Sequence, residues 1–414
     1  MKHDKRSLVL TVVVAALGYF VDIYDLLLFG IVRVASLRAI GVPEAELLEV
    51  GIRLINAQMA GLLCGGILWG ILGDKRGRLS VLFGSIFLYS VANIANAFVT
   101  TPEQYAWMRF IAGVGLAGEL GAAITLVSEV MSKETRGIGT TIVAAVGVLG
   151  AVLAGFIGET FDWKTAYIIG GVMGLCLLVL RVRMLESGLF HSLKHTEHIR
   201  RGDFLMLFRS RQRFTRYLYC ILIGVPIWYV IGILITFSPE LARELSVTAP
   251  VRAGTAIMMS YLGLSLGDLA SGLLSQWLKS RRKVVGLFLL MILIGVIAYS
   301  QASKITTFQF YALCLYLGFS VGYWAVFVTV GAEQFGTNLR ATVATTVPNF
   351  VRGSVVPITL SFEYLSRARD WELLHAALAV GLVCIAVAAL ALWRMQETFA
   401  RDLNYLEIDA QPKV

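Results

Sequence analysis

The stretch of sequence that decides the fold follows an apolar segment early in the chain and reads Gly70-Ile71-Leu72-Gly73-Asp74-Lys75-Arg76-Gly77-Arg78. Glycines near the end of such a segment let two helices approach each other closely inside a membrane. Asp74 can pair with a basic residue or cap a helix N-terminus, and Gly77 permits a tight turn. Arg76 and Arg78 would anchor the chain at the inner membrane surface. The string therefore predicts a short inner turn between two membrane-spanning helices.

The composition of the whole chain agrees with a membrane protein. Of its 414 residues, 57% are hydrophobic and only 15% are charged, whereas an average soluble domain has ~25% charged residues. Twelve helices of ~20 residues would use ~240 residues, which is close to the hydrophobic content and leaves no room for a large soluble domain. The same composition excludes a disordered chain, a collagen and a coiled coil. The five cysteines show neither a disulfide framework nor a zinc-ligand spacing.

Twelve apolar segments, each bounded by charge, proline or glycine, are the predicted transmembrane helices: 8–35, 51–72, 79–99, 103–131, 137–159, 165–185, 217–239, 252–278, 284–301, 307–333, 339–364 and 371–394. They are too long for barrel strands, which need only ~10 residues each, and helices satisfy their own backbone polar groups in lipid. The first segment exceeds a signal peptide in length and is interrupted by Asp22 and Asp25, so we expect it to be retained. The predicted fold class is all-α.

Lysine and arginine set the predicted topology. Roughly 25 basic residues lie in segments on the side of the N-terminus and about 7 lie in the opposite loops. This distribution predicts cytoplasmic N- and C-termini in the cell (inner) membrane, and it explains the net charge of +9 without a nucleic-acid partner. The predicted domains are an N-terminal six-helix bundle (1–185), a cytoplasmic linker with an amphipathic helix over 203–216 (186–216), a C-terminal six-helix bundle (217–394) and a cytoplasmic tail (395–414).

The second half carries a weaker copy of the inner turn, in which Gln276 stands where the first half has Asp74. Two halves related in this way are typical of secondary transporters. The first copy resembles the inner-loop signature of the major facilitator superfamily. The resemblance implies two pseudo-symmetric six-helix bundles and a gating role for the inner turn through Gly73, Asp74, Arg76, Gly77 and Arg78.

A second string resembles the fourth span of the metabolite:proton symporter and sugar-porter branches of that superfamily: Arg109-Phe-Ile-Ala-Gly113-Val-Gly115-Leu-Ala-Gly118-Glu119. Its glycines favour close helix packing. They are not a nucleotide-binding fingerprint, because no strand precedes them. The residues that follow, Glu129 and Arg136, are expected to belong with the gating residues. The string Glu186-Ser187-Gly188-Leu189-Phe190 and the tail string Glu397-Thr398-Phe399 resemble further signatures of the same family.

Charges inside the apolar segments are the candidates for proton coupling, because a charge in lipid is costly unless it is paired or hydrated. In the resembling symporters an acid on helix 1 faces an arginine on helix 4 and takes the coupling proton. This resemblance implies Asp25 and Arg109, with Asp22 and Glu119 as further members of the set. A static ion pair that braces two helices is the alternative. The Asp-x-x-Asp spacing also resembles the aromatic-acid:proton symporters, although leucines replace that family's next glycines.

The predicted substrate site centres on Arg352 in the middle of segment 339–364, where an unpaired cation favours an anionic ligand or a partner such as Glu363. The full set of expected substrate-binding residues is Tyr24, Asn56, Gln58, Trp324, Asn349 and Arg352. For the aromatic residues the alternative is a place in the interfacial belt, and for the amides it is a hydrogen bond between helices.

We therefore expect a secondary active transporter that moves a small polar metabolite, an organic anion, with protons by alternating access. An uncoupled facilitator or exchanger and a drug:proton antiporter remain alternatives, although helix 5 lacks the proline that drug antiporters carry. No intramembrane catalytic motif and no Walker loop occurs, so an enzyme is not expected. We expect no metal and no cofactor beyond the proton gradient. The expected partners are the small-molecule substrate, protons and the lipid bilayer, and we expect a monomer.

Overall fold

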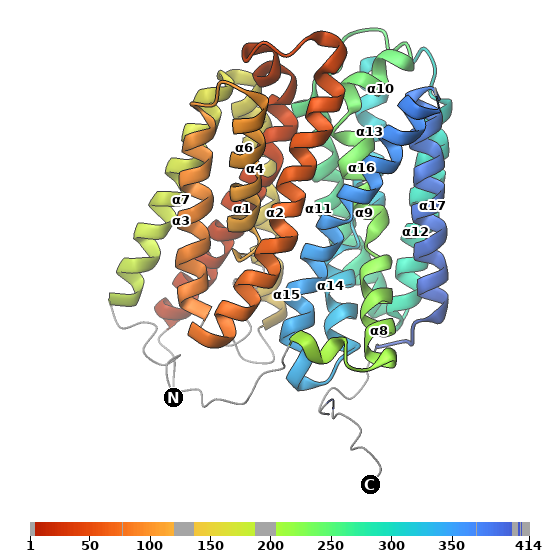
Figure 1. Cartoon of the computed structure of the whole chain (residues 1–414). Helices are drawn as coiled ribbons and strands as arrows, with labels where there is room; N and C mark the ends of the chain where they lie inside the picture. Colours follow the sequence, from red (N-terminus) through yellow and green to blue (C-terminus); the bar gives the residue numbers. More distant parts are fainter. Residues whose placement is uncertain are drawn as a thin grey trace. The chain divides into compact units, whose positions relative to one another are not determined.

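The computed structural model describes residues 5–76, 78–119, 136–186, 204–369, 371–399, 405 and 407. Every regular element in this part of the chain is helical (Figure 1). Eight spans among the described residues are long and apolar enough to cross a membrane. Contacts group the chain into two units, the first with residues 1–198 and 252–258 and the second with residues 199–251 and 259–414.

Unit 1 contains, in chain order, α1 (Lys5–Ala39), the 3₁₀ turn η1 (Glu44–Glu46), α2 (Leu47–Arg76), α3 (Arg78–Asn96), α4 (Pro102–Leu116), α6 (Arg136–Thr160) and α7 (Trp163–Glu186). Two helix starts show why the sequence begins a helix there. The Thr101 hydroxyl accepts the Gln104 N–H before α4, and the Asp162 carboxylate accepts the Thr165 N–H before α7. Both are N-cap contacts that satisfy otherwise unpaired N–H groups.

Glycines bring the backbones of unit 1 into direct contact. A Cβ atom on Gly113 of α4 would overlap the carbonyl oxygen of Gln58 in α2, and one on Gly61 of α2 would overlap the carbonyl oxygen of Phe110. The α1–α6 crossing is similar, because Gly150 faces the Phe20 carbonyl with no room for a side chain. Close packing of this kind holds helices together where lipid supplies no hydrophobic driving force.

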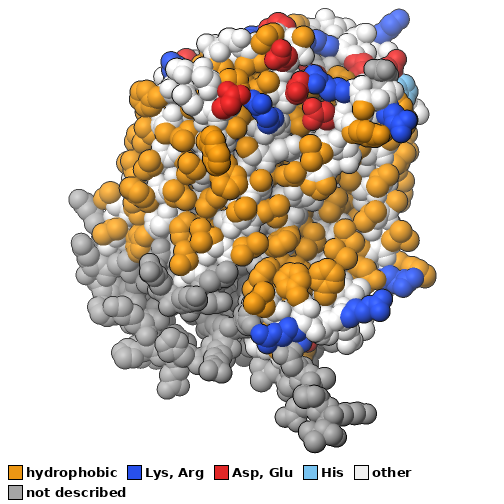
Figure 2. All heavy atoms as spheres, viewed as in Figure 1, with side chains coloured by type: hydrophobic (Ala, Val, Ile, Leu, Met, Phe, Trp, Pro, Cys, Tyr) orange, Lys and Arg blue, Asp and Glu red, His pale blue; other side chains and the backbone are white. Residues whose placement is uncertain are grey.

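Unit 2 contains, in chain order, η3 (Phe204–Leu207), α8 (Arg211–Leu222), α9 (Val225–Tyr229), the π-helical η4 (Val230–Ile235), α10 (Ser238–Glu244), α11 (Ala253–Trp277), α12 (Arg281–Gln301), α13 (Thr307–Ser320), α14 (Trp324–Glu333), α15 (Thr337–Gly353), α16 (Val355–Glu363), the π-helical η5 (Tyr364–Ala368) and α17 (Leu373–Arg394). The first turns of α11 group with unit 1. Figure 2 shows apolar side chains over the visible flanks of the helices and charged side chains gathered near helix ends.

Three predicted helices of unit 2 are interrupted rather than continuous. Segment 217–239 divides before Pro226, which has no N–H to continue the helix. Segment 307–333 divides at Gly322, between α13 and α14. Segment 339–364 divides at Ser354, between α15 and α16.

Two inner segments also differ from the prediction. The amphipathic helix expected over 203–216 is instead the 3₁₀ turn η3 followed by the start of α8 at Arg211. Leu207 and Arg213 are buried there, so packing against unit 2 replaces a flat surface helix. In the first half, α2 continues to Arg76 and α3 begins at Arg78. The expected inner turn is therefore mostly helix, and Gly77 lies outside the described residues.

The glycine contact between α2 and α4 predicts that a larger residue at Gly113 destabilises the protein. We expect Gly113→Ala to lower the apparent melting temperature of the detergent-solubilised protein, because the added methyl group would have to displace backbone, and overpacking costs about 1–3 kcal/mol. The matched control is Gly272→Ala in α11, where nothing lies within 4 Å of the position of the new Cβ. That control is expected to be neutral or slightly stabilising, since alanine favours helix over glycine. Equal melting temperatures for the two variants would contradict the packing argument.

Candidate functional site

The guanidinium of Arg109 is the centre of the polar site in unit 1. Arg109 is fully buried in α4. Its Nη2 donates to the Oδ1 of Asn93 at 2.6 Å and its Nε donates to the Oδ1 of Asn96 at 3.4 Å. The guanidinium carbon lies 4.8 Å from the ring centroid of Tyr167. Two amides and one aromatic face therefore compensate this charge in place of water.

The structure brings two predicted carboxylates of α1 to the same region. Asp22 and Asp25 are fully buried, and Asp25 interacts electrostatically with both Arg109 and Asp22. A Cβ atom on Gly170 of α7 would overlap Oδ1 of Asp25, so the glycine leaves the space that the carboxylate occupies. The hydrogen bonds of Arg109 to the two amides do not involve Asp25. The carboxyl group can therefore gain or lose a proton without depriving the arginine of those bonds.

Two tyrosines extend this polar region. The hydroxyl of Tyr105 lies 3.1 Å from the Oγ of Ser36, to which it can donate a hydrogen bond. It also lies 2.7 Å from the hydroxyl of Tyr167, and either of these two hydroxyls can be the donor. The predicted substrate residue Tyr24 is fully buried, and its hydroxyl donates to the Ala166 carbonyl at 2.8 Å. That hydrogen bond connects α1 to α7 and gives Tyr24 a role in helix packing.

Glu119, the fourth predicted coupling residue, lies apart from Asp25 and has its own partner. Both of its carboxylate oxygens accept hydrogen bonds from Arg181 of α7, at 2.5 and 3.1 Å. Glu119 is fully buried and Arg181 is 6% exposed. Arg181 was not among the predicted site residues. Its position within the apolar segment 165–185 was the available signal.

In unit 2, Arg352 lies at the end of α15, just before the interruption at Ser354, and is 1% exposed. Its guanidinium carbon lies 5.9 Å from the ring centroids of both Trp228 and Trp324. Asn349 lies one turn earlier on the same helix and is also buried. The partner considered from the sequence, Glu363, lies at the far end of α16.

The site around Arg352 can therefore bind an anion beside aromatic faces. Trp228 was not among the residues predicted to bind substrate, because a tryptophan in a membrane protein is more often a residue of the interfacial belt.

The remaining predicted residues are more scattered. Gln58 of α2 is 1% exposed, and its Nε2 donates to the Leu26 carbonyl at 3.4 Å, which is a hydrogen bond between helices. Asn56 is half-buried on the same helix.

Among the predicted gating residues, Gly77 and Glu129 lie outside the described residues. The others are described in their backbone alone: Gly73, Asp74 and Arg76 end α2, Arg78 begins α3 and Arg136 begins α6.

Comparisons with known proteins agree with this architecture. The sequence profile of the Major Facilitator Superfamily matches residues 8–368. The niacin transporter of Acinetobacter baylyi is 24% identical, over 94% of this chain and 94% of that protein. The gentisate transporter of Corynebacterium glutamicum is 26% identical, over 81% of this chain and 73% of that protein.

Among solved structures, the crystal structure of a D-xylose–proton symporter matches 94% of this chain and 98% of its own chain, with a TM-score of 0.67 and 15% identity. At this identity the likeness concerns the fold. The predicted all-helical fold of two six-helix bundles is thereby confirmed.

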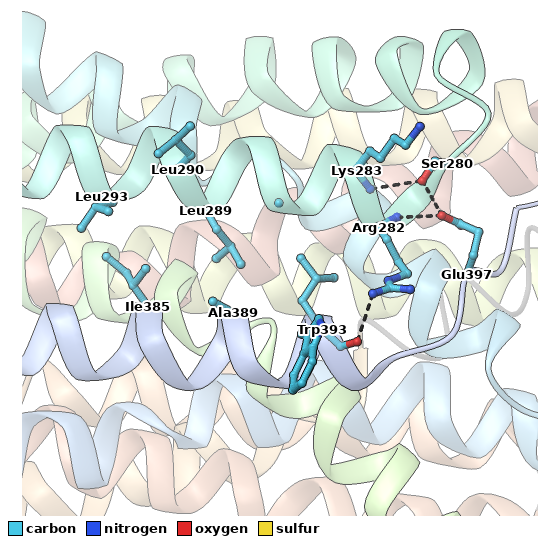
Figure 3. Close-up of a pocket in the computed structure, with 12 residues that line it drawn as sticks. Ser280, Arg282, Lys283, Leu289, Leu290, Leu293, Ile385, Ala389, Trp393 and Glu397 are labelled. Carbon is cyan, nitrogen blue, oxygen red and sulfur yellow. Dashed lines mark hydrogen bonds between the residues drawn. The ribbon is translucent and has the colours of Figure 1, made fainter.

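A groove between α12 and α17 of unit 2 runs from the start of α12 and the end of α17 (Figure 3). Its walls are apolar, with Leu289 and Leu290 on one helix and Ile385 and Ala389 on the other. Leu290 and Trp393 are 52% and 68% exposed, so the groove opens to the surface of the bundle. An apolar, open groove of this kind suits lipid chains rather than a polar substrate.

The polar end of the groove is closed by Glu397, which follows α17. Its carboxylate accepts hydrogen bonds from the Ser280 hydroxyl and the Arg282 N–H (Figure 3). It also accepts the N–H of Arg281 at the start of α12. It also accepts the Phe399 N–H at 3.0 Å. Desolvation raises the pKa of Glu397, but these hydrogen bonds outweigh it and lower the pKa to about 2.

This capping contact predicts a pH-dependent contribution to stability. Because the pKa of Glu397 is lower in the folded protein than its ordinary value of 4.5, the ionised carboxylate stabilises the fold above pH 4.5. This contribution should disappear as the pH falls to about 2. We therefore expect Glu397→Gln to lower the melting temperature at neutral pH and the difference from wild type to shrink across that window.

The control is Glu46→Gln, because Glu46 is an exposed residue of the 3₁₀ turn η1. This variant is expected to melt like the wild type at every pH. A Glu397→Gln difference that stays constant down to pH 2 would contradict the capping role.

Proposed function

The chain belongs to the Major Facilitator Superfamily of membrane transporters, and on that premise we propose that it carries a small aromatic carboxylate together with protons. It is a multi-pass transporter of small metabolites and not an enzyme. The observation that carries the proposal is the buried Arg352 between two tryptophan rings. A buried guanidinium attracts an anionic ligand more strongly than an exposed one does, and the rings offer flat faces on which an aromatic substrate can stack.

The proposed substrate class agrees with what the relatives carry. Niacin and gentisate, named for the transporters from Acinetobacter baylyi and Corynebacterium glutamicum, are both small aromatic acids. In this chain the carboxylate would bind Arg352 and the ring would lie against Trp228 or Trp324. Asn349 would offer its amide to a polar ring substituent.

Proton coupling is proposed for the Asp25–Arg109 site. A buried carboxyl group beside a buried arginine binds a proton when it is moved away from the cation and releases it when it returns. Alternating access supplies such a movement. The proton gradient would be the energy source, with no cofactor. An uncoupled facilitator, in which Asp25 only braces the helices, is the competing function.

The topology and assembly belong to the same proposal. The excess of lysine and arginine on the side of the termini supports cytoplasmic N- and C-termini in the inner membrane. Asp74, Arg76 and Arg78 at the junction of α2 and α3 would hold one conformation of the cycle, together with Glu129 and Arg136. We propose that the transporter works as a monomer.

The proton site is tested with Asp25→Asn in reconstituted liposomes. We expect this variant to lose uphill uptake of nicotinate driven by a pH gradient, because the amide cannot carry a proton, while nicotinate counterflow is retained. The control is Asp268→Asn in α11. Asp268 accepts the Ala325 N–H at 3.0 Å, and an asparagine oxygen can keep this bond. Concentrative uptake by Asp25→Asn would favour the uncoupled facilitator.

The substrate site is tested with Arg352→Gln. We expect nicotinate to bind at least about tenfold more weakly, because hydrogen bonds to charged groups contribute about 1.5–3 kcal/mol. Binding of nicotinamide, the neutral amide, should change little. Arg369→Gln, at an exposed arginine of the same unit, should leave nicotinate binding unchanged. Equal affinity of the wild type for the acid and the amide would refute an anion site.

A further inference from the structure

Tyr89 of α3 is buried, and its hydroxyl has no hydrogen-bond partner among the described residues. Two glycines on neighbouring helices contact this residue, one at its backbone and Cβ and the other at its ring. A Cβ atom on Gly115 of α4 would come within 2.7 Å of the Tyr89 Cβ, and one on Gly174 of α7 would come within 3.0 Å of the Tyr89 ring. A buried hydroxyl without a partner is unfavourable and calls for an explanation.

The charged groups around Tyr89 come from three different helical segments. Its hydroxyl interacts electrostatically with Asp22 and Asp25 of α1, with Glu119 after α4 and with Arg181 of α7. Tyr89 is therefore near enough to interact electrostatically with carboxylates of both the Asp25–Arg109 site and the Glu119–Arg181 ion pair.

One face of α7 aligns these groups. Gly170, Gly174 and Arg181 are spaced i, i+4 and i+11, which places them on the same side of a helix. Gly170 faces the Asp25 carboxylate and Gly174 faces the Tyr89 ring. Arg181 binds Glu119 through both carboxylate oxygens. From Gly170 to Arg181 the face extends about 16 Å along the helix axis, at ~1.5 Å per residue.

The ion pair at the end of this face is held against α1. A Cβ atom on Gly18 would overlap Nη2 of Arg181 and Oε1 of Glu119, and Nη2 also reaches the Val14 carbonyl at 3.5 Å. Gly18 lies one turn before Asp22 on α1, towards the N-terminus. The pair therefore lies on the N-terminal side of Asp22 and Asp25, towards the end where α7 also terminates.

We propose that Asp25, Asp22, Tyr89 and the Glu119–Arg181 pair form a proton path through unit 1, which we call the polar lane. The lane leads from the coupling site towards the end of the unit where α1 begins and α7 ends. This inference rests on the proton symport proposed above.

The transfer along the lane conserves charge. The carboxyl proton of Asp25 or Asp22 passes to the hydroxyl oxygen of Tyr89, while the hydroxyl's own proton passes to a carboxylate oxygen of Glu119. Water molecules bridge the gaps that exceed a hydrogen bond. The proton then leaves Glu119 towards the end of the unit where α1 begins, and both hydrogen bonds from Arg181 to the carboxylate form again. Tyr89 ends neutral, so no charge is left on the phenol.

The decisive variant is Tyr89→Phe, which removes one oxygen and no hydrogen bond to a described residue. Its melting temperature should therefore match that of the wild type. In liposomes we expect proton-driven nicotinate uptake to fall on the order of tenfold or more. Nicotinate counterflow, which needs no net proton release, should stay at the wild-type rate. The pH inside the vesicles, followed with a trapped dye, should show the same loss of proton flux.

The matched control is Tyr299→Phe in unit 2. It also removes a buried tyrosine hydroxyl, one that donates to the Leu234 carbonyl at 3.1 Å, but it lies outside the lane. Proton-driven uptake by this variant, scaled to its counterflow, should equal that of the wild type.

Three outcomes would overturn the polar lane, and they separate it from the proposed function. Wild-type coupled uptake in Tyr89→Phe would remove the lane and leave proton symport intact. An equal fall in coupled uptake and counterflow would show that Tyr89 supports the whole transport cycle and has no specific role in proton transfer. If the wild type itself carries neither nicotinate nor gentisate with protons, the proposed function fails and the lane fails with it.

Discussion

The charge of Arg109 is buried in the middle of a helix bundle, and the polar interior of unit 1 is arranged around that constraint. An ion in a low-dielectric interior is tolerated only where fixed dipoles or counter-charges replace water. Here Asn93 and Asn96 accept hydrogen bonds from the guanidinium, and the Tyr167 ring offers its face. These hydrogen bonds go to neutral amides and not to Asp25, which interacts with Arg109 through its charge.

Glycines make this arrangement possible. Helices that meet at Gly61 and Gly113, or at Gly150, approach until backbone touches backbone. On α7 the same residue type has another use, since Gly170 and Gly174 leave room for the Asp25 carboxylate and the Tyr89 ring. The glycines of this unit therefore serve both packing and the placement of polar groups inside it.

In unit 2 the buried cation is surrounded by different groups. Arg352 lies beside two tryptophan rings at the interruption between α15 and α16. Helix interruptions leave backbone groups without helical partners, and such backbone is tolerated at membrane depth only where it is buried or lines a cavity. This contrast agrees with the proposed function, in which unit 1 would carry the proton and unit 2 would bind the aromatic anion.

The sequence by itself determined the fold class, since the length of the apolar segments and the repeated inner turn leave few alternatives to a two-bundle membrane protein. It also singled out Asp25, Arg109, Glu119 and Arg352, because a charge in an apolar segment is visible without any structure. The partners of these charges are different. Arg181 lies 62 residues from Glu119, and pairing across such a distance depends on which helix faces which.

Only the tertiary structure decided those partners and the interruptions in the helices of unit 2. Hydropathy averages over a segment and does not register a local change of helix type such as η4. Hydropathy also cannot show which neighbouring group occupies the space that a glycine leaves on one face of a helix. Asn93, Tyr89 and Trp228 are ordinary residues in the sequence, and they acquire a role through the charged groups that the fold places beside them.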